Sequence, residues 1–497
     1  MRSRSPFSAL RFISVVMIVL AMIITVLQLV RFSRLRANFP AGLVIADIPV
    51  GGLSRPEAAE RLRQAYGEPI EIRFNGAPIH LNPSVIDFEL DLEAMLAAAD
   101  LDRTDQSFWV EFWDYLWGRT SGAAQVPLRF DYSEQRLRTF LDGVAERYNQ
   151  PPEAAQPVAG TVNFSPGQPG VALDIDEAIL PVELALQSPY NRAVELPLTR
   201  TNPPRPAFQN LQVQLQQTIQ VSGFDGLVDV YLLDLQTVQE MHFAVQSGEP
   251  ISVQPDIAFT ASSIIKIPIM ISAYRRLPVN PDPETEKLLS DMIEKSGNEA
   301  ADWLMDRVID DSRGPLLVTE DMQALGLTNT FMAGYFSLGS PLLATFETPA
   351  NQRPDINTDP DIYSQTTPAV IGMLLADLYQ CAQSGGSALA AVFPGQFDDA
   401  KCQSMINLLT RNKLPVLLTA GIPDGTQIAH KHGWVTANGV INTLGDAGII
   451  YSPGGSYVLV VFLHHPNQLI WEPASELVAD LSQAVYNYYN LPAFAAQ

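Results

Sequence analysis

The chain has 497 residues, of which 47% are apolar and 9% are aromatic. This composition supplies enough apolar side chains for folded cores, so an intrinsically disordered chain is excluded. Acidic residues outnumber basic residues by 54 to 31, which gives a net charge of −23. Such a charge repels a phosphate backbone and argues against a nucleic-acid partner. The length allows about two to four domains.

An uncharged apolar run occupies residues 12–30. At about 1.5 Å per residue, a helix of this length crosses a hydrocarbon layer of about 30 Å, so we predict one transmembrane helix. Three arginines precede the run and three follow it, so charge does not orient it. The run is longer than a signal-peptide core and lacks a small-residue cleavage site, which favours an uncleaved anchor. We expect residues 1–11 to be a cytoplasmic tail and residues 37–497 to be extracytoplasmic.

Residues 38–206 are predicted to form a smaller mixed α/β module. Within it, residues 44–62 predict a strand, a Gly51-Gly52 turn, a Ser54 N-cap and a helix. This segment resembles the opening of the peptidoglycan-binding domains that lie between a membrane anchor and a catalytic domain in bacterial surface proteins. The resemblance implies binding to the cell wall. An alternative of equal weight is a spacer that lifts the next domain off the membrane.

The segment Asn202-Pro203-Pro204-Arg205-Pro206 predicts a stiff linker and a domain boundary. We expect residues 207–497 to form the catalytic domain, with an α+β fold in which an antiparallel sheet carries a helical lobe. The expected elements are a first helix at 211–221, strands at 226–235, 445–451 and 455–462, and a closing helix at 471–486.

The sequence Ser263-Ile264-Ile265-Lys266 places a serine one helical turn before a lysine. Residues at this spacing share one helix face, and a lysine that has lost its proton accepts the hydroxyl proton and activates the serine as a nucleophile. The pair alone is a weak signal, because a buried helix whose lysine extends to water shows the same pattern. The boxes that follow it give it weight.

Two further boxes follow in order. Ser296-Gly297-Asn298 offers a hydroxyl and a carboxamide in a turn before a helix, and Lys431-His432-Gly433 lies on a predicted strand. The order Ser-x-x-Lys, Ser-Gly-Asn, Lys-His-Gly resembles the penicillin-recognising serine hydrolases, and most of all the class A β-lactamases. The resemblance covers roughly residues 210–492 and implies a β-lactamase-like fold.

The resemblance also implies roles for individual residues. Ser263 is the expected nucleophile and Lys266 its activating base. Ser296 is expected to relay a proton to the leaving nitrogen, and Asn298 to hold the acylamide of the substrate. Lys431 is expected to attract the substrate carboxylate and to depress the pKa of Lys266.

Two backbone roles complete the expected site. Gly433 is expected to let the substrate lie close along the strand. The backbone N–H groups of Ser263 and Trp434 are expected to form the oxyanion hole, a role that tolerates any side chain at position 434.

The chain departs from the family pattern at two places. His432 stands where a threonine or serine is usual, so an imidazole replaces a hydroxyl that contacts the substrate carboxylate. Glu347 and Asn351 have the Glu-x-x-x-Asn spacing of the family's deacylation base, but the stretch before Glu347 is longer than in the family. Glu347 is therefore either a deacylation base or a solvated loop residue.

The chain has two cysteines, Cys381 and Cys402, at the end of one helix-like segment and the start of the next. We expect them to form a disulfide, with two buried free thiols as the alternative. His430 and His432 alternate on a predicted strand, but two ligands without a third do not predict a metal site. We expect no metal and no cofactor.

Two hypotheses for the function follow. The first is a membrane-anchored serine acyl hydrolase that forms an acyl-enzyme with a β-lactam or with a D-alanyl wall peptide, as a β-lactamase or a D,D-peptidase. The second is a catalytically idle surface protein that binds the cell wall. His432 and the long stretch before Glu347 favour the second hypothesis, whereas the three retained boxes favour the first.

Overall fold

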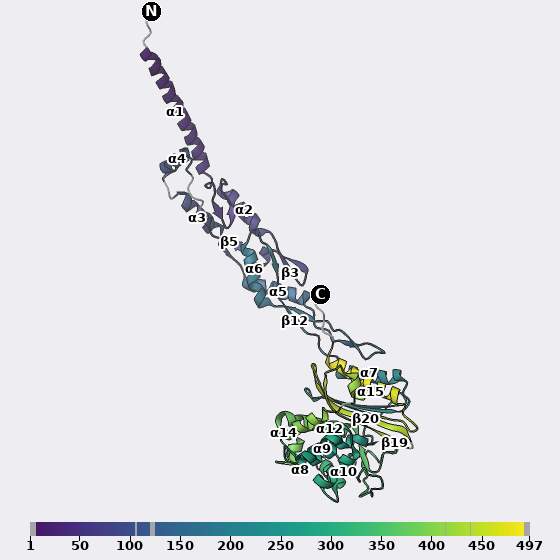
Figure 1. Cartoon of the computed structure of the whole chain (residues 1–497). Coiled ribbons are helices and arrows are strands. Elements are labelled where there is room, and N and C mark those ends of the chain that lie inside the picture. Colours follow the sequence, from purple (N-terminus) through teal and green to yellow (C-terminus); the bar gives the residue numbers. More distant parts are fainter. Residues whose placement is uncertain (1–5, 105–106, 120–124, 413, 438, 492–497) are drawn as a thin grey trace, which may run out of the picture. The chain divides into compact units, whose positions relative to one another are not determined.

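The computed structural model describes residues 6–104, 107–119, 125–412, 414–437 and 439–491 (Figure 1). Its contacts divide the chain into two compact units. Unit 1 consists of Met1–Pro152 and Pro169–Asn202, and unit 2 consists of Glu153–Gln168 and Pro203–Gln497. Residues 153–168, which the sequence analysis assigns to the N-terminal module, thus group with unit 2.

The main sheet of unit 1 has the strand order β11-β3-β4, formed by Ala193–Glu195, Ile70–Phe74 and Ala77–Leu81. Strands β3 and β4 form a hairpin in which Asn75 and Gly76 have φ values of 48° and 80°. An Asn-Gly pair is the usual sequence for such a two-residue turn, because both positions need a left-handed backbone. The apolar faces of α5 (Glu134–Tyr148) and α6 (Ile175–Gln187) pack against this sheet.

A second core of unit 1 surrounds a sheet of order β2-β1-β6, with helices α2 and α3. Helix α2 (Arg55–Gly67) begins after Ser54, whose backbone N–H donates to the Glu57 carboxylate at 2.8 Å. This confirms the predicted capped helix. The other elements of unit 1 are β1 (Val44–Ile45), β2 (Ile48–Pro49), η1 (Pro83–Ile86), β5 (Glu89–Leu90), α3 (Leu92–Thr104), α4 (Phe108–Leu116), β6 (Gln125–Val126), β7 (Phe130–Asp131), β10 (Gly170–Leu173) and β12 (Leu198–Thr201).

The N-terminal helix α1 runs from Pro6 to Arg36. Its segment Arg11–Arg36 contains an 18-residue window with a mean hydropathy of 2.8, and it is the one helix within the described ranges that is long and apolar enough to cross a membrane. The predicted run, residues 12–30, lies inside it. A signal sequence near an N-terminus has the same length and composition.

Unit 2 is built on a six-stranded antiparallel sheet of order β15-β14-β13-β21-β20-β19. All eight residues of strand β13 are buried, and six of them are apolar or aromatic, with Asp229 and Asp234 as the two exceptions. The strands are β13 (Leu227–Asp234), β14 (Glu240–Gln246), β15 (Glu249–Ile251), β19 (Gln427–Ala437), β20 (Val440–Ser452) and β21 (Gly455–His464). The three strands predicted from the sequence correspond to β13, β20 and β21.

Helices cover both faces of this sheet (Figure 1). On one face, α7 (Phe208–Ser222) and α15 (Trp471–Tyr489) form a core with the sheet. On the other face, a helical lobe forms a larger core. The lobe contains α8 (Lys266–Arg276), α9 (Pro283–Glu294), α10 (Asn298–Leu304), the π-helical segment η3 (Met305–Ile309), α11 (Gly314–Ala324), α12 (Pro368–Ser384), α13 (Ala388–Val392) and α14 (Asp399–Leu409). The α+β fold with a helical lobe is therefore confirmed.

Two smaller features complete the lobe. Short strands β16 (Phe259–Thr260), β18 (Ser364–Thr366) and β17 (Phe331–Met332) form a sheet beside the start of α8. Cys381 of α12 and Cys402 of α14 form a disulfide, which is the pairing that the sequence analysis expects.

The segment 153–168 contributes strands β8 (Gln156–Pro157) and β9 (Phe164–Ser165) to unit 2. Phe164 is buried in the α7 and α15 core, where its ring lies 6.0 Å from that of Tyr488. The side-chain amide of Gln214 on α7 donates to the carbonyls of Thr161 and Asn163, both at 3.0 Å. Apolar packing and hydrogen bonds together hold residues 153–168 on unit 2.

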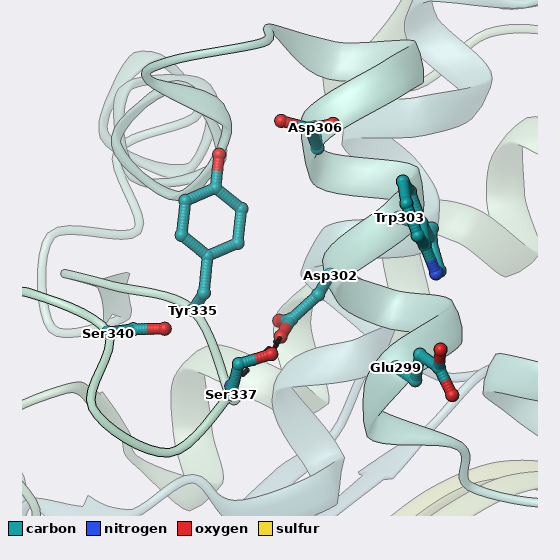
Figure 2. Close-up of a pocket in the computed structure, with 7 residues that line it drawn as sticks. All are labelled: Glu299, Asp302, Trp303, Asp306, Tyr335, Ser337 and Ser340. Atoms are coloured by element: carbon teal, nitrogen blue, oxygen red, sulfur yellow. Dashed lines mark hydrogen bonds between the residues drawn. The ribbon is translucent and has the colours of Figure 1, made fainter.

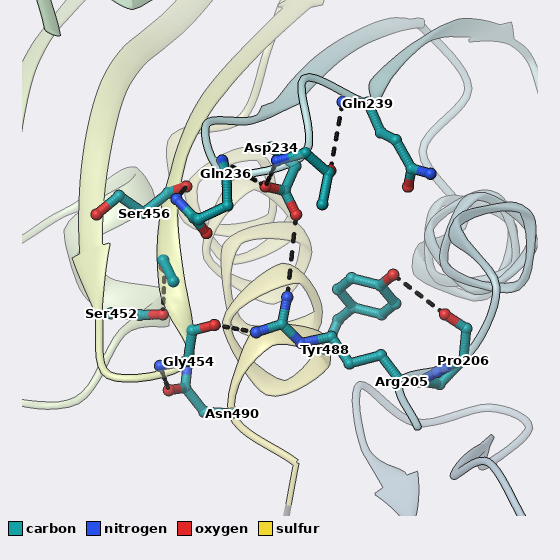
Figure 3. A network of polar contacts seen from close by, with 12 residues as sticks. Arg205, Pro206, Asp234, Gln236, Gln239, Ser452, Gly454, Ser456, Tyr488 and Asn490 are labelled. Carbon is teal, nitrogen blue, oxygen red and sulfur yellow. Dashed lines mark hydrogen bonds and ion pairs between the residues drawn. The ribbon is translucent and has the colours of Figure 1, made fainter. Parts of the chain in front are cut away.

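The end of the proline-rich segment is also held on unit 2 (Figure 3). The Arg205 guanidinium donates to the Gly454 carbonyl, lies 3.9 Å from the Asp234 carboxylate and stacks over the Tyr489 ring. The Tyr488 hydroxyl donates to the Pro206 carbonyl at 3.1 Å. The part of the predicted linker that follows Pro203 is therefore fixed to the sheet and its closing helix.

Candidate active site

The serine of the first box lies on η2 (Ser262–Ile265), a short 3-10 turn that leads from β16 into α8. Ile264 and Ile265 are fully buried and fix this turn in the lobe core, while Ser263 is half-buried. Ser262 has φ 49°, a left-handed conformation that costs a non-glycine residue energy and is held by its surroundings. The local fold thus presents the Ser263 hydroxyl at the end of a strained turn.

Lys266 is completely buried, and its amine meets four oxygen atoms. The Nζ atom lies 3.0 Å from Ser263 Oγ, 2.6 Å from the Ser296 carbonyl, 2.7 Å from Asn298 Oδ1 and 3.3 Å from Ser296 Oγ. Burial, together with the nearby positive charge of Lys431, lowers the pKa of Lys266 to about 7. A large part of this amine is therefore neutral near neutral pH.

The contacts of Lys266 match the hydrogen-bonding capacity of a neutral amine. Two N–H groups are satisfied by the Ser296 carbonyl and Asn298 Oδ1, the two shortest contacts. The charged amine donates its third N–H to Ser263 Oγ, whereas the neutral amine has its lone pair free for the hydroxyl hydrogen of Ser263. The geometry lets Lys266 accept the proton of the serine without moving.

Ser296 and Lys431 extend this network on the other side of the nucleophile. Lys431 Nζ donates to Ser296 Oγ at 3.0 Å, and Ser296 Oγ donates to Ser263 Oγ at 2.8 Å. Burial lowers the pKa of Lys431 to about 8, so this amine is mostly charged at neutral pH. The hydroxyls of Ser296 and Ser263 each accept one hydrogen bond and donate one. The hydrogen bonds therefore all point the same way, from the charged Lys431 to the neutral Lys266.

Gly433 has a role that the sequence did not indicate. A Cβ atom added at this position would lie 2.2 Å from Ser262 Oγ and 2.6 Å from the backbone nitrogen of Ser263. Only glycine therefore lets β19, the edge strand of the sheet, approach the η2 turn. This close approach brings the following residue, Trp434, to the nucleophile segment.

A cleft of about 500 Å³ opens at the nucleophile. Its walls come from the η2 turn, the start of α10, the loop after β17 and the end of β19. The cleft-lining residues include Ser262, Ser263, Asn298, Phe336, Tyr363 and Trp434. Ser263 of the first box, Asn298 of the second and Trp434, which directly follows the third, thus converge on one cavity from positions far apart in the chain.

A second, acidic hollow of about 320 Å³ lies beside the cleft and shares Tyr335, Ser337 and Ser340 with it (Figure 2). In it, the Asp302 carboxylate accepts hydrogen bonds from the backbone N–H groups of Phe336 and Ser337, at 2.8 and 2.9 Å, and from the Ser337 hydroxyl at 2.6 Å. The Phe336 ring lies 5.0 Å from Lys266 Nζ. Asp302, which the sequence analysis missed, therefore positions the loop that covers the buried amine.

His432 is buried away from the cleft rather than lining it. Its Nδ1 lies 3.0 Å from the Asn412 amide and its ring stacks on Trp434 at 5.4 Å. Burial lowers the pKa of His432 to about 4, so the imidazole is neutral. The backbone carbonyl of His432 accepts a hydrogen bond from Lys431 at 3.0 Å.

His430 gains a partner that the sequence analysis also missed. Its Nδ1 lies 3.0 Å from the carboxylate of Asp446 on β20, and its Nε2 lies 3.3 Å from the Thr419 hydroxyl. His430, His432 and Asp446 offer atoms within 4.8 Å of one another that are of the types that bind metals. The hydrogen bonds to Asp446 and Thr419 use both ring nitrogens of His430, so the cluster supports β19 as a hydrogen-bonded network.

With this geometry in view, the comparisons with known proteins can be interpreted. Residues 275–489 match the "Beta-lactamase enzyme family". The match includes Ser296, Asn298 and Lys431, whereas Ser263 and Lys266 lie just before it. Residues 79–195 match the family "Putative peptidoglycan binding domain".

Solved structures similar to this chain include that of PBP-A, with 21% identity over 58% of this chain and 98% of that chain and a TM-score of 0.40. A β-lactamase from Xanthomonas campestris pv. campestris has 18% identity over 56% of this chain and 97% of that chain, with a TM-score of 0.39. An ancestral class A β-lactamase has 20% identity over 55% and 98%, with a TM-score of 0.39. No curated protein matches the chain.

Glu347 is exposed in unit 2 and is not one of the residues that line the cleft. Asn351, the other half of the predicted pair, donates to the Phe346 carbonyl and to Gln365, and so holds its own loop in shape. The structure therefore does not bring Glu347 to Ser263. Within the described ranges, no carboxylate forms a hydrogen bond with the nucleophile.

Proposed function

We propose that unit 2 is a serine acyl hydrolase that forms an acyl-enzyme at Ser263 with a β-lactam or with a D-alanyl wall peptide. The observation that carries this proposal is the buried Lys266 amine, which lies 3.0 Å from the Ser263 hydroxyl and has a pKa of about 7. A nucleophile and a base matched to neutral pH, within hydrogen-bond distance, are what acyl transfer requires.

In the acylation step, Ser263 Oγ attacks the carbonyl carbon of the substrate and its proton passes to Lys266 Nζ. The carbonyl oxygen becomes an oxyanion, for which the backbone N–H groups of Ser263 and Trp434 are the proposed donors. The close approach of β19 at Gly433 supports this assignment, because it brings the two segments together. The charge of Lys431 stabilises the added negative charge.

Collapse of this intermediate breaks the carbon–nitrogen bond. The leaving nitrogen takes a proton from Ser296 Oγ, which is resupplied by Lys266 at 3.3 Å. The proton lost by Ser263 thus ends on the leaving amine, and the acyl group remains on Ser263. The carboxylate that flanks the scissile bond in both substrate classes is the proposed partner of the positive Lys431, and Asn298 in the cleft is the proposed contact for the acylamide.

Release of the acyl group requires a base that activates water. Since Glu347 lies outside the cleft, we infer that hydrolysis is slow and that the acyl-enzyme persists, as in a penicillin-binding protein. Deacylation rates of Glu347→Gln and wild type on one β-lactam test this inference. Equal, slow rates are expected, and a selective collapse of deacylation in the variant would restore Glu347 as the base.

For unit 1, we propose a wall-binding role and a single-pass anchor that places both units outside the cytoplasm. The match of residues 79–195 to a peptidoglycan-binding family and the apolar helix α1 support this arrangement. The disulfide between Cys381 and Cys402 also supports it, because disulfides persist in oxidising compartments.

The test of the catalytic proposal is labelling of the full-length protein with a fluorescent penicillin. Wild type is expected to become covalently labelled, Ser263→Ala is expected to remain unlabelled, and Ser404→Ala on α14 serves as a serine control outside the cleft. If wild type is neither labelled nor able to cleave a D-alanyl ester or amide, the catalytic proposal is lost. Co-sedimentation of the Ser263→Ala protein with purified peptidoglycan then tests whether a wall-binding function remains.

A further inference from the structure

Helix α4 in unit 1 has two apolar faces, and one of them packs on α1. Phe32 of α1 inserts among three aromatic rings of α4, with centroid distances of 5.4 Å to Phe108, 5.4 Å to Phe112 and 5.2 Å to Tyr115. These three residues recur at a helical spacing of three and four, so they form one face of the helix. Phe32 and Phe112 are buried as a result.

Polar contacts fix the position of α4 along α1. The Arg36 guanidinium and the Glu111 carboxylate form an ion pair at 2.9 Å, and the Tyr115 hydroxyl donates to Gln28 Oε1 at 3.0 Å. All the contacts described therefore fall between Gln28 and Arg36, at the C-terminal end of α1, and Figure 1 shows α4 beside that end. The helix is held at one defined level on α1.

The opposite face of α4 presents large apolar side chains to the surroundings. Trp109, Trp113 and Trp117 are 68%, 60% and 67% exposed, and Val110 and Leu116 lie among them. Half of the six tryptophans of the chain are on this one short segment. A patch of this kind on a water-facing surface is unfavourable, so it points to a partner that covers it.

We propose that this tryptophan face lies in the interfacial layer of the lipid bilayer, as a second membrane contact beside the α1 anchor. The uncharged run of α1 ends at Val30, so residues 28–36 lie where the hydrocarbon layer gives way to the headgroups. Tryptophan is enriched at this depth, because its ring is apolar and its indole N–H is polar. Arg31 and Arg34 are exposed at the same level and can meet lipid phosphates.

The proposal rests on the anchor proposed for α1. A second membrane contact would limit how unit 1 moves relative to the membrane. A single spanning helix leaves the domain next to it free to tilt, whereas a second contact at the surface limits that tilt. A cluster of tryptophans on a helix fixed to the end of the span would therefore hold the start of unit 1 in a defined orientation on the membrane.

Site-directed spin labelling of the full-length protein tests the proposal. The two native cysteines are disulfide-bonded, so a nitroxide reacts only with an introduced cysteine. The variants are Trp113→Cys and Trp109→Cys on α4, Ile18→Cys within the apolar run, and Leu180→Cys, an exposed apolar position on α6, as the water-facing control. Each is placed in nanodiscs of phosphatidylcholine and phosphatidylglycerol, and accessibility to oxygen is compared with accessibility to a water-soluble nickel complex.

The label at 18 is expected to show a high ratio of oxygen to nickel accessibility, the labels at 109 and 113 an intermediate ratio, and the label at 180 a low ratio. A ratio at 109 and 113 equal to that at 180, with 18 still high, overturns the proposal while the anchor stands. A low ratio at 18 overturns both. Dipolar broadening between labels at 113 in neighbouring molecules, without oxygen preference, would assign the face to a second copy of the chain and also overturn it.

Discussion

The two units of this protein bury their cores by different means. The main sheet of unit 2 has three strands, β19, β20 and β21, that contain 11, 13 and 10 residues, whereas no strand in the described part of unit 1 exceeds five residues. The long strands carry Lys431 to within 3.0 Å of the hydroxyl of Ser296, 135 residues away in the chain. The short strands of unit 1 close two separate small cores. A proton-transfer site needs long, rigidly paired strands that hold distant residues in fixed positions. A binding or spacing module does not need them.

If unit 2 holds the proton-transfer site and unit 1 does not, removal of a catalytic side chain from unit 2 should have the largest effect on the acylation rate. Lys266→Met removes the base, so the acylation rate with a fluorescent penicillin should fall by about 10²- to 10⁴-fold. The matched control is Lys401→Met, which replaces another buried lysine of unit 2 whose amine donates to the Tyr274 and Gln396 carbonyls. Equal losses of acylation in both variants, at equal folded fraction, would contradict the assignment of Lys266.

The pH dependence of acylation should report the two lysines. Below the Lys266 pKa of about 7 the amine is protonated and cannot accept the Ser263 proton, so the rate should rise about tenfold per pH unit up to that value. Above the Lys431 pKa of about 8 the positive charge is lost and the rate should fall. The second-order acylation constant of wild type measures both limbs. Lys431→Met should lose the upper limb, and a flat profile in wild type would refute both roles.

A comparison of two glycines sharpens the contrast between the units. Gly433→Ala forces a methyl group against Ser262 and the backbone of Ser263, and overpacking of this kind costs about 1–3 kcal/mol. Gly67→Ala, at the end of α2 in unit 1, meets no atom within 4 Å. Chemical denaturation should show a loss of stability for Gly433→Ala alone, together with slower acylation. Unchanged acylation in Gly433→Ala would show that β19 need not approach the nucleophile.

The smallest effect is expected from a helix cap in unit 1. Ser54→Ala removes the N-cap hydroxyl that donates to the Glu57 carboxylate at the start of α2, and loss of an N-cap serine costs about 0.5–2 kcal/mol of local stability. Hydrogen exchange should increase in the first turn of α2, and the acylation rate should equal that of wild type. A change in the acylation rate would show that the two units are coupled, and would contradict the view that the site of unit 2 does not depend on unit 1.

The sequence predicted those parts of the fold whose signals are local. The mostly apolar stretch of β13, the Ser54 cap and the apolar period of α15 each lie in one short segment, so each could be recognised directly. The three boxes of the site were recognisable because their spacing is distinctive. The structure places Ser263, Lys266, Ser296, Asn298 and Lys431 in one network.

What the sequence did not reveal depends on contacts between distant segments. Asp302 contacts the backbone at Phe336 and Ser337, more than 30 positions away, and nothing in its local sequence indicates this. The pairing of His430 with Asp446 depends on the register of β19 and β20. The position of Glu347 depends on how a long loop folds, so its spacing from Asn351 alone was a poor guide.

The excursion of residues 153–168 onto unit 2 has a consequence for how the protein is made. During synthesis this segment emerges before any strand of the sheet that it will cover, and Phe164 must wait for Tyr488, over 300 residues later, before its ring can be buried. Assembly of the catalytic fold is therefore completed last, by the C-terminal helix α15, and a ribosome that stalls before Trp471 would release a chain with an exposed apolar hairpin. Such chains are the expected targets of quality-control proteases.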